Sequence, residues 1–406
     1  MHHRVADKMS THPISPRFFF ILAIMAGATA ANLYYNQPLL VLMGKTFGVP
    51  DARMGLVTTF TQAGYAIGLL AFVPLADYLE RRRLVMGLLL LVSVALLAVG
   101  LSQSLAWLDI SSFFVGLFTI VPQVLVPLAA DLADNTNRGR VVGTVMSGLL
   151  IGILVARTFS GLIAGVWGWR TVYFIASVMM LIVLAYVFWQ FPQHRSSHPA
   201  ENFTSLMRSL LELVAHEPEL RRVSLTGGLI FAAFSAVWTT LTFRLSGVPY
   251  HYPASTIGLF GLVGVAGALI APVAGRLADR RDPRFAVIGA LILAVVVYVL
   301  LGVASAILPL LILGIIGVDL ATNSAQISNQ ARVYGIRPEA RGRSNTVYMV
   351  CYFIGASLGS ALGSLLWTEL GWVGVMGLCV VFIGLAGAIH YWSYRMQPSD
   401  TNPSLR

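Results

Sequence analysis

Apolar residues along the chain gather into long stretches, and a short polar segment separates each stretch from the next. Each stretch has about the 20 residues that an α-helix needs to cross a hydrocarbon core about 30 Å thick. The pattern predicts an all-α membrane protein with twelve transmembrane helices. The predicted spans are residues 17–43, 53–76, 83–103, 107–132, 140–166, 170–191, 223–246, 254–275, 284–304, 306–331, 343–367 and 372–394.

Composition favours a membrane protein over a soluble domain. Of the 406 residues, 57% are hydrophobic and 11% are charged, and the mean hydropathy is +0.78. A soluble domain carries about 25% charged residues. Polar Asn32, Tyr34 and Gln37 interrupt the first apolar stretch, unlike the uniform core of a cleaved signal peptide, so we interpret it as a span. Cys351 and Cys379 both fall inside predicted spans and indicate no disulfide or metal framework.

The net charge of +10 follows the predicted topology. Most of the 27 lysines and arginines lie at the termini and in alternate loops, which the positive-inside rule assigns to the cytoplasm. We therefore expect a multi-pass protein of the cell membrane, the inner membrane if the source is bacterial, with both termini cytoplasmic. This distribution accounts for the basic charge without a nucleic-acid partner.

The two halves of the chain repeat each other. Arg138-Gly139-Arg140 recurs as Arg341-Gly342-Arg343, Gly152 recurs as Gly355, and Gly168-Trp169 recurs as Gly371-Trp372, each at an offset of 203 residues. Repeated matches at one offset indicate duplication, and secondary transporters use such repeats. We expect six-helix units at residues 1–191 and 223–406, joined by a cytoplasmic linker at 192–222 that holds a short amphipathic helix.

Two loop motifs at the spacing of the repeat resemble the signature of the major facilitator superfamily, G-x-x-x-D-R-x-G-R-R. The copy GRLADRRDPR supplies Gly275, Asp279, Arg280 and Arg284, and the copy VPLADYLERRR keeps Asp77 and Arg81 to Arg83. The resemblance covers the whole chain. It implies two pseudo-symmetric six-helix bundles, a central cavity lined by spans 1, 4, 7 and 10, and a drug/proton-antiporter-like branch.

The antiporter signature on span 5, G-x-x-x-G-P-x-x-G-G, is kept only in part. The segment GILVARTFSG retains Gly152 and Gly161, but Arg157 replaces the proline. Ser112 stands where the conserved arginine of span 4 is expected. Both departures set this chain apart from the antiporter pattern.

Asp319 is the first candidate for chemistry, because a carboxylate inside a membrane is costly and usually functional. With Asn323, Gln326 and Gln330 it forms one face of span 10. We predict that Asp319 binds the coupling proton and that Arg157, at a similar depth, pairs with it across the two halves. The alternatives are a permanently paired structural acid and an arginine that caps carbonyl groups or reaches outward.

Polar residues at mid-membrane on other spans are candidates for the wall of a substrate cavity. Hydrogen bonding between helices is the alternative role for them. The candidates are Asn32, Tyr35, Asn36, Gln37, Gln62, Gln123, Trp238, Asn323 and Gln326. Pro38 is expected to disturb the helix of span 1.

A third group of charged residues lies in the predicted cytoplasmic loops. The resemblance implies that the acid of the first signature loop faces the start of span 11, where the helix dipole stabilises it. Arg81 or Arg82 could pair with Asp131 or Asp134 to lock an inner gate. The predicted gate residues are Asp77, Arg81, Arg82, Asp131, Asp279 and Arg280.

These features together favour a secondary transporter of a small organic molecule. The sequence contains no phosphate-binding loop, no hydrolase motif and no His/Cys cluster, so we expect neither an enzyme nor a cofactor. The leading prediction is proton-coupled efflux by antiport, with protons, a small-molecule substrate and the lipid bilayer as partners, and a monomeric state. The alternatives are a proton-coupled symporter for uptake of a sugar or organic anion, and a membrane scaffold or sensor without transport.

Overall fold

The computed structural model describes residues 16–134, 137–191, 203–264 and 283–395, and all regular secondary structure in these ranges is helical. Ten helices in the described part of the chain are long and apolar enough to cross a membrane, and Ala254–Gly264 is a shorter apolar helix. The prediction of an all-α membrane fold is confirmed. The predicted eighth span, residues 254–275, lies partly outside the described residues.

The first half of the chain forms helices close to the predicted spans. Two spans are interrupted, because proline lacks an N–H and its ring clashes with the carbonyl four residues earlier. The first span breaks after Leu33, ahead of Pro38, and the fourth breaks after Phe118, ahead of Pro122. The elements are α1 (Pro16–Ala30), η1 (Ala31–Leu33), η2 (Gln37–Leu39), α2 (Leu40–Phe47), α3 (Asp51–Phe72), α4 (Leu75–Tyr78), α5 (Arg81–Gly100), α6 (Leu105–Phe118), α7 (Val121–Leu132), α8 (Arg138–Trp167) and α9 (Trp169–Gln190).

The second half follows the same plan. Its last element contains both of the final predicted spans, which are separated by a non-helical residue, Gly371, with a φ of 63°. Glycine adopts this left-handed conformation without steric cost. The elements are α10 (Phe203–His216), α11 (Pro218–Ser246), the helix Ala254–Gly264, α13 (Pro283–Ala304), α14 (Leu308–Ile336), η3 (Pro338–Ala340) and α15 (Arg341–Arg395).

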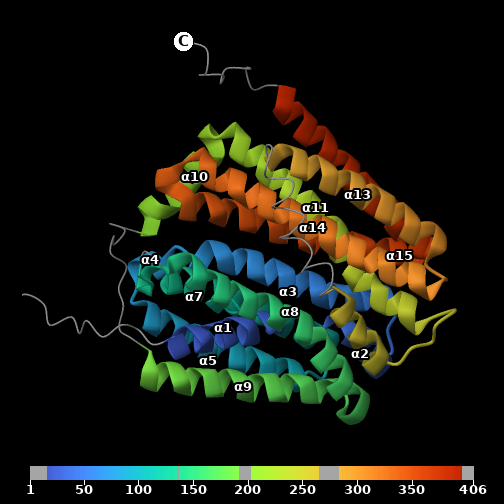
Figure 1. The fold of residues 1–406 in the computed structure, drawn as a ribbon. Coiled ribbons are helices and arrows are strands. Elements are labelled where there is room, and N and C mark those ends of the chain that lie inside the picture. The colour runs from blue at the N-terminus through green and yellow to red at the C-terminus, as the bar shows by residue number, and fades with distance from the viewer. Residues whose placement is uncertain (1–15, 135–136, 192–202, 265–282, 396–406) are drawn as a thin grey trace, which may run out of the picture.

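The helices of the two halves form two bundles that lie side by side (Figure 1). Within the first bundle, Gly152 of α8 lies against Gly27 of α1 so closely that a methyl group on either would overlap the other helix. Gly355 of α15 lies against Gly228 of α11 in the same way. Small residues let membrane helices approach closely. The repeated glycines therefore form equivalent helix contacts in the two bundles.

The ends of the helices define two ends of the molecule. We call the end that holds Arg81, Arg138 and Arg341, the first residues of α5, α8 and α15, the basic end. Hydrogen bonds between the bundles come from the part nearer the other end. Gln62 of α3 donates to Ser235 Oγ of α11 at 2.6 Å, and Thr158 of α8 donates to the carbonyl oxygen of Gly258 at 3.0 Å. The bundles are therefore joined away from the basic end.

The contact between α8 and the helix Ala254–Gly264 depends on the absence of a side chain at Gly161. A methyl group there would lie 2.8 Å from the Cα of Gly258. We expect Gly161→Leu to separate the two helices, since overpacking costs about 1–3 kcal/mol. The population of forms opened at this end should rise about fivefold to a hundredfold. Distances between spin labels at exposed Val166 and Val248, in a background without the two native cysteines, measure this change.

The matched control for Gly161→Leu is Gly143→Leu on the same helix. A Cβ atom added at Gly143 would meet no atom of a neighbouring helix within 4 Å. The control should leave the label distances of the parent unchanged. Equal distances in both variants would show that this contact does not hold the end closed.

Candidate functional site

A cavity of about 520 Å³ lies between the two bundles. It extends from Arg157 and Asp319, near the middle of α8 and α14, to Tyr334 and Arg343 at the basic end. The polar face predicted for span 10 lies on its wall, because Asp319, Asn323, Gln326 and Gln330 all line the cavity. The four residues share a face because their spacing matches the helical repeat. The structure therefore offers one chamber with wall residues from both halves.

Asp319 is buried at the inner end of this cavity, with 2% of its surface exposed. Its Oδ2 atom has no hydrogen-bond partner in the described part of the chain. Gly264 packs against it, and a methyl group at Gly264 would lie 3.3 Å from both carboxylate oxygens. The ionisable groups that interact with Asp319 are Arg157 from α8, Tyr34 from the break in span 1, Tyr298 from α13 and Tyr352 from α15.

Arg157 is buried opposite Asp319, with 3% of its surface exposed. Its Nε donates to Gln37 Oε1 at 2.6 Å, and its guanidinium carbon lies 3.8 Å from the ring centre of Trp238. The ring centre of Tyr34 is 5.0 Å away on the same cavity wall. These contacts fix the side chain, yet its Nη2 atom has no hydrogen-bond partner among the described residues.

The predicted pair of Arg157 and Asp319 shares one cavity, and the two charges interact electrostatically. No direct ion pair joins them in the described residues, because Gln37 and Trp238 hold the guanidinium instead. Burial of a charge is costly unless hydrogen bonds and a counter-charge compensate it. The two groups therefore present one unused donor and one unused acceptor.

Aromatic rings from both bundles form part of the cavity wall. We call Tyr65, Phe231, Phe234, Tyr352 and Phe353 the aromatic wall, and all five line the cavity. The rings of Phe231 and Tyr352 stack with centroids 3.8 Å apart, and those of Tyr65 and Phe353 lie 4.3 Å apart. Stacked aromatic rings give an apolar surface of fixed shape.

The other predicted cavity residues divide between the wall and the packing. Gln123 lines the cavity and donates to Tyr65 Oη at 3.1 Å, while Gln326 accepts from Tyr352 at 3.2 Å. Asn323 also lies on the wall and donates to the backbone carbonyl of Asp319 at 2.7 Å. These three residues combine a place on the wall with a hydrogen bond to a neighbour.

The predicted residues of span 1 and Gln62 lie in contacts between helices. Asn32 contacts Met180 Sδ at 3.3 Å, and Asn36 donates to Thr61 at 3.2 Å. The ring of Tyr35 packs 6.1 Å from that of Phe159. Gln62, besides its bond to Ser235, accepts from Ser360 at 2.9 Å. Gln37 and Trp238 act on the cavity through Arg157, which they hold.

Four residues of the aromatic wall, Phe231, Phe234, Tyr352 and Phe353, were not among the predicted cavity residues. Phe231 and Phe234 precede Trp238 at intervals of three and four residues, so all three share one face of α11. That spacing was the available signal. Tyr34, rather than its neighbour Tyr35, lines the cavity because the helix is interrupted between η1 and η2.

Among the predicted gate residues, Arg81 and Asp131 form an ion pair with a distance of 2.8 Å between Nη1 and Oδ2. Arg138 lies 3.6 Å from the same carboxylate, and Arg82 donates to the carbonyl oxygen of Phe188. All these contacts lie inside the first bundle. Asp279, Arg280 and the side chain of Asp77 lie outside the described residues. The gate role of the group stays a prediction.

Substitutions at the Arg81–Asp131 ion pair and at its exposed edge should differ in their effect on stability. Arg81 is buried, whereas 38% of the Asp131 side chain is exposed, so solvent weakens the pair. We expect Asp131→Asn to lower the free energy of unfolding by about 1 kcal/mol, because it leaves a buried cation without its counter-charge. Thermal unfolding of the purified protein measures this loss. Arg138→Gln, at the exposed edge of the pair, should change it little, and equal losses would contradict the assignment.

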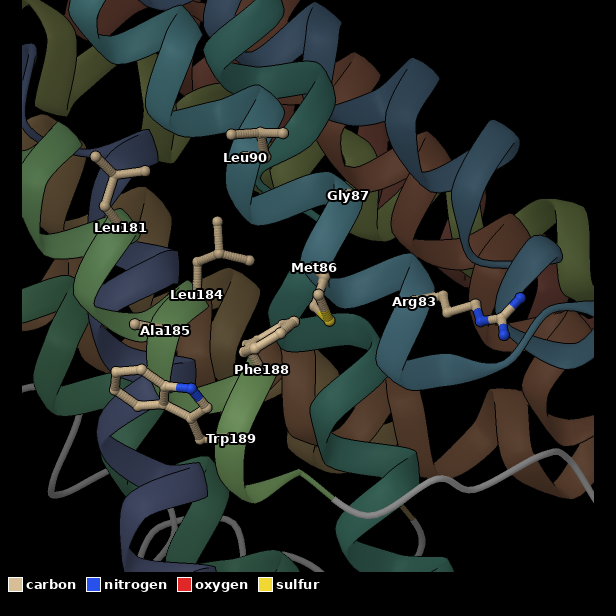
Figure 2. Close-up of a pocket in the computed structure, with 9 residues that line it drawn as sticks. All are labelled: Arg83, Met86, Gly87, Leu90, Leu181, Leu184, Ala185, Phe188 and Trp189. Atoms are coloured by element: carbon tan, nitrogen blue, oxygen red, sulfur yellow. The ribbon is translucent and has the colours of Figure 1, made fainter.

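A second hollow, of about 590 Å³, lies on the outside of the first bundle between α5 and α9. In Figure 2, Met86, Leu184 and Phe188 face this hollow, while the charged end of Arg83 points away. Phe188 and Trp189 are 55% and 74% exposed. Apolar side chains on the outer face of a membrane protein contact lipid. Apart from Arg83 and the indole N–H of Trp189, the side chains that line this hollow are apolar, unlike those of the central cavity.

Comparison with known proteins agrees with the fold. Residues 19–336 match the model of the Major Facilitator Superfamily. The chain is 40% identical over 381 residues to a protein named uncharacterized transporter YgaY of Escherichia coli, covering 94% of this chain and 96% of the relative. It is 32% identical over 369 residues to the probable transporter SCO4007 of Streptomyces coelicolor, covering 91% and 85%.

Solved structures show the same fold at low identity. A structure of the nucleoside transporter NupG aligns with a TM-score of 0.74 at 12% identity, covering 94% of this chain and all of the other. A bacterial homologue of the human lysosomal transporter Spinster, in an inward-facing and unoccupied conformation, aligns at 0.71 with 15% identity, covering 94% and 98%. With the family-model match over residues 19–336, relatives named as transporters, many apolar helices and a cavity between two bundles, this chain belongs to the Major Facilitator Superfamily and is a membrane transporter.

Proposed function

We propose that this protein exports a small amphipathic organic molecule in exchange for protons, as in the drug/proton-antiporter-like branch of its superfamily. The observation that carries the proposal is Asp319, a buried carboxylate with an unpartnered oxygen at the inner end of a cavity between the bundles. Burying a carboxylate at such a depth costs free energy, so an acid found there usually has a function. The proposed function of Asp319 is to bind and release the coupling proton.

The proposed orientation follows from the arginines. The positive-inside rule places the basic end in the cytoplasm, and with it both termini of the chain. The cavity reaches the basic end at Tyr334 and Arg343, which supports access to it from the cytoplasm. A cavity with this access receives a substrate from inside the cell. The protein then resides in the cell membrane, as a monomer.

The coupling step is competition at Asp319. Substrate from the cytoplasm binds when Asp319 is ionised, and the bundles rock to open the other end. A proton from outside then neutralises the carboxylate and displaces the substrate. The neutral acid allows the bundles to return, and the proton leaves to the cytoplasm. Exchange follows because proton and substrate use the same group at different times.

Proteoliposomes that contain the wild-type protein and a pH-sensitive dye test this proposal. Compounds from a library are added outside, one at a time, to vesicles without a pH gradient. Uptake of an exchanged compound through either orientation of the protein should release protons from the vesicle, so the interior becomes alkaline. Acidification that accompanies uptake would reverse the proposal and establish symport. Transport of a compound without any proton movement would contradict proton coupling.

Proton symport of an organic anion is the second candidate. The unpartnered Nη2 of Arg157 favours it, because a guanidinium group binds carboxylates strongly. An anion on Arg157 would remove the counter-charge of Asp319 and so promote proton binding. Proton and anion would then bind together and move in one direction. The direction of the dye signal separates the two candidates.

A further inference from the structure

The inner end of the cavity presents two unused groups of opposite charge. Arg157 Nη2 is a donor without a partner and Asp319 Oδ2 is an acceptor without a partner, in the described part of the chain. Both residues are more than nine-tenths buried and both line the cavity. They come from different bundles, through α8 and α14, and they do not meet in a direct ion pair. A bound molecule with two charges would satisfy both.

We propose that the substrate is a zwitterion, with a carboxylate that binds Arg157 and an ammonium group that binds Asp319. This inference rests on the proposed function, since both use Asp319 as the site of competition. The planar guanidinium group suits a carboxylate, which it can bind through two N–H groups. The Nε of Arg157 already donates to Gln37, and the face of the guanidinium group lies over the ring of Trp238. The Nη side of the group therefore remains for the ligand.

The side chains around the two charges indicate the chemistry of the rest of the substrate. The aromatic wall contributes rings from both bundles to the cavity lining. Aliphatic side chains of α8 add Met146, Leu149, Leu150 and Ile153. A substrate that fits this lining has an apolar part next to a positive and a negative group. An amino acid with a large apolar side chain has this combination. We therefore assign the substrate class as amphipathic zwitterions of this kind.

The charge of the substrate also decides the direction of coupling. An ammonium group on Asp319 and a proton exclude each other, which leads to antiport. A molecule with a carboxylate only would bind Arg157 and favour protonation of Asp319, which leads to symport. A zwitterion keeps the competition while it neutralises Arg157. The proposed class thus accounts for antiport in a site that holds an arginine.

Equilibrium binding to the purified full chain in detergent tests the class. Three probes share one phenyl body: L-phenylalanine carries both charges, 3-phenylpropanoate only the negative one, and 2-phenylethylamine only the positive one. We expect L-phenylalanine to bind about tenfold tighter than either of the others, because each lacks one charge-assisted hydrogen bond. Equal or tighter binding of a singly charged probe would overturn the proposal, as would binding by none of the three.

Variants assign each charge to its residue. In Arg157→Gln, L-phenylalanine should bind no better than 2-phenylethylamine, since the carboxylate has lost its partner. In Asp319→Asn, it should bind no better than 3-phenylpropanoate. Gly143→Ala, on the same helix as Arg157 but outside the cavity lining, should keep the order of the wild type. A retained order in both cavity variants would place the binding site elsewhere and overturn the proposal.

The test separates this inference from the proposed function, because it uses no gradient. A preference for the zwitterion together with uncoupled transport would contradict proton antiport and support the proposed substrate class. Proton-coupled export of molecules without the two charges, with no preference for L-phenylalanine, would remove the substrate class and leave antiport.

Discussion

Asp319→Asn is expected to abolish proton-driven transport while exchange of substrate for substrate continues. Asparagine has nearly the shape of aspartate, but its side chain cannot gain or lose a proton near neutral pH. A carrier whose side chain at this position is always neutral can return without carrying a proton, so its transport is uncoupled from the pH gradient. In proteoliposomes, accumulation of substrate driven by an imposed pH gradient should fall to the level of empty vesicles. Counterflow without a gradient should remain measurable.

The matched control for Asp319 is Asp109, the other acid that is buried in a described span. Asp109 has 6% of its surface exposed and pairs with Arg53 near the end of the molecule away from the basic end. Asp109→Asn removes a buried carboxylate outside the cavity, so we expect gradient-driven flux to persist in it. Gradient-driven flux that persists in Asp319→Asn would show that Asp319 is a structural acid.

Arg157→Gln is expected to weaken substrate binding at least about tenfold. The arginine supplies a charged donor in a desolvated cavity, where a hydrogen bond to a charged group contributes about 1.5–3 kcal/mol. Its stacking on Trp238 is already present without substrate, so it positions the guanidinium group rather than adding to the binding free energy. Arg157→Lys keeps the charge but loses the planar group, so we expect an intermediate loss. Titration of the purified variants with a transported compound measures both.

Arg170 provides the control for Arg157. It also stacks on a tryptophan, with its guanidinium carbon 4.4 Å from the ring centre of Trp169, but it lies outside the cavity lining. Arg170→Lys should therefore change stability rather than affinity. Unchanged affinity in Arg157→Gln would show that the substrate does not use the inner end of the cavity.

The prediction from sequence was most accurate where local pattern decides the structure. The spans follow runs of apolar residues, and the interruptions ahead of Pro38 and Pro122 follow from the missing N–H of proline. The shared face of Asp319, Asn323 and Gln326 follows from the repeat of the helix, and all three residues line the cavity. These features depend on residues a few positions apart.

Prediction was weaker where partners come from distant parts of the chain. The bond between Arg157 and Gln37 joins residues 120 positions apart, and the bonds from Gln62 to Ser235 and Ser360 cross between the bundles. A polar residue in a span can face the cavity or another helix, and the sequence pattern is the same in both cases. The choice depends on the rotation and packing of each helix.

The sequence by itself determined the class of this protein, the positions of the described spans, the repeat of its halves and the depth of Arg157 and Asp319. Hydrophobic length and helical periodicity are local properties, so they can be read along the chain. Only the tertiary structure decided that Arg157 and Asp319 share a cavity without a direct ion pair, that aromatic rings form part of its wall, and that the cavity extends to the basic end. These features arise from contacts between two bundles, whose relative position no local pattern records.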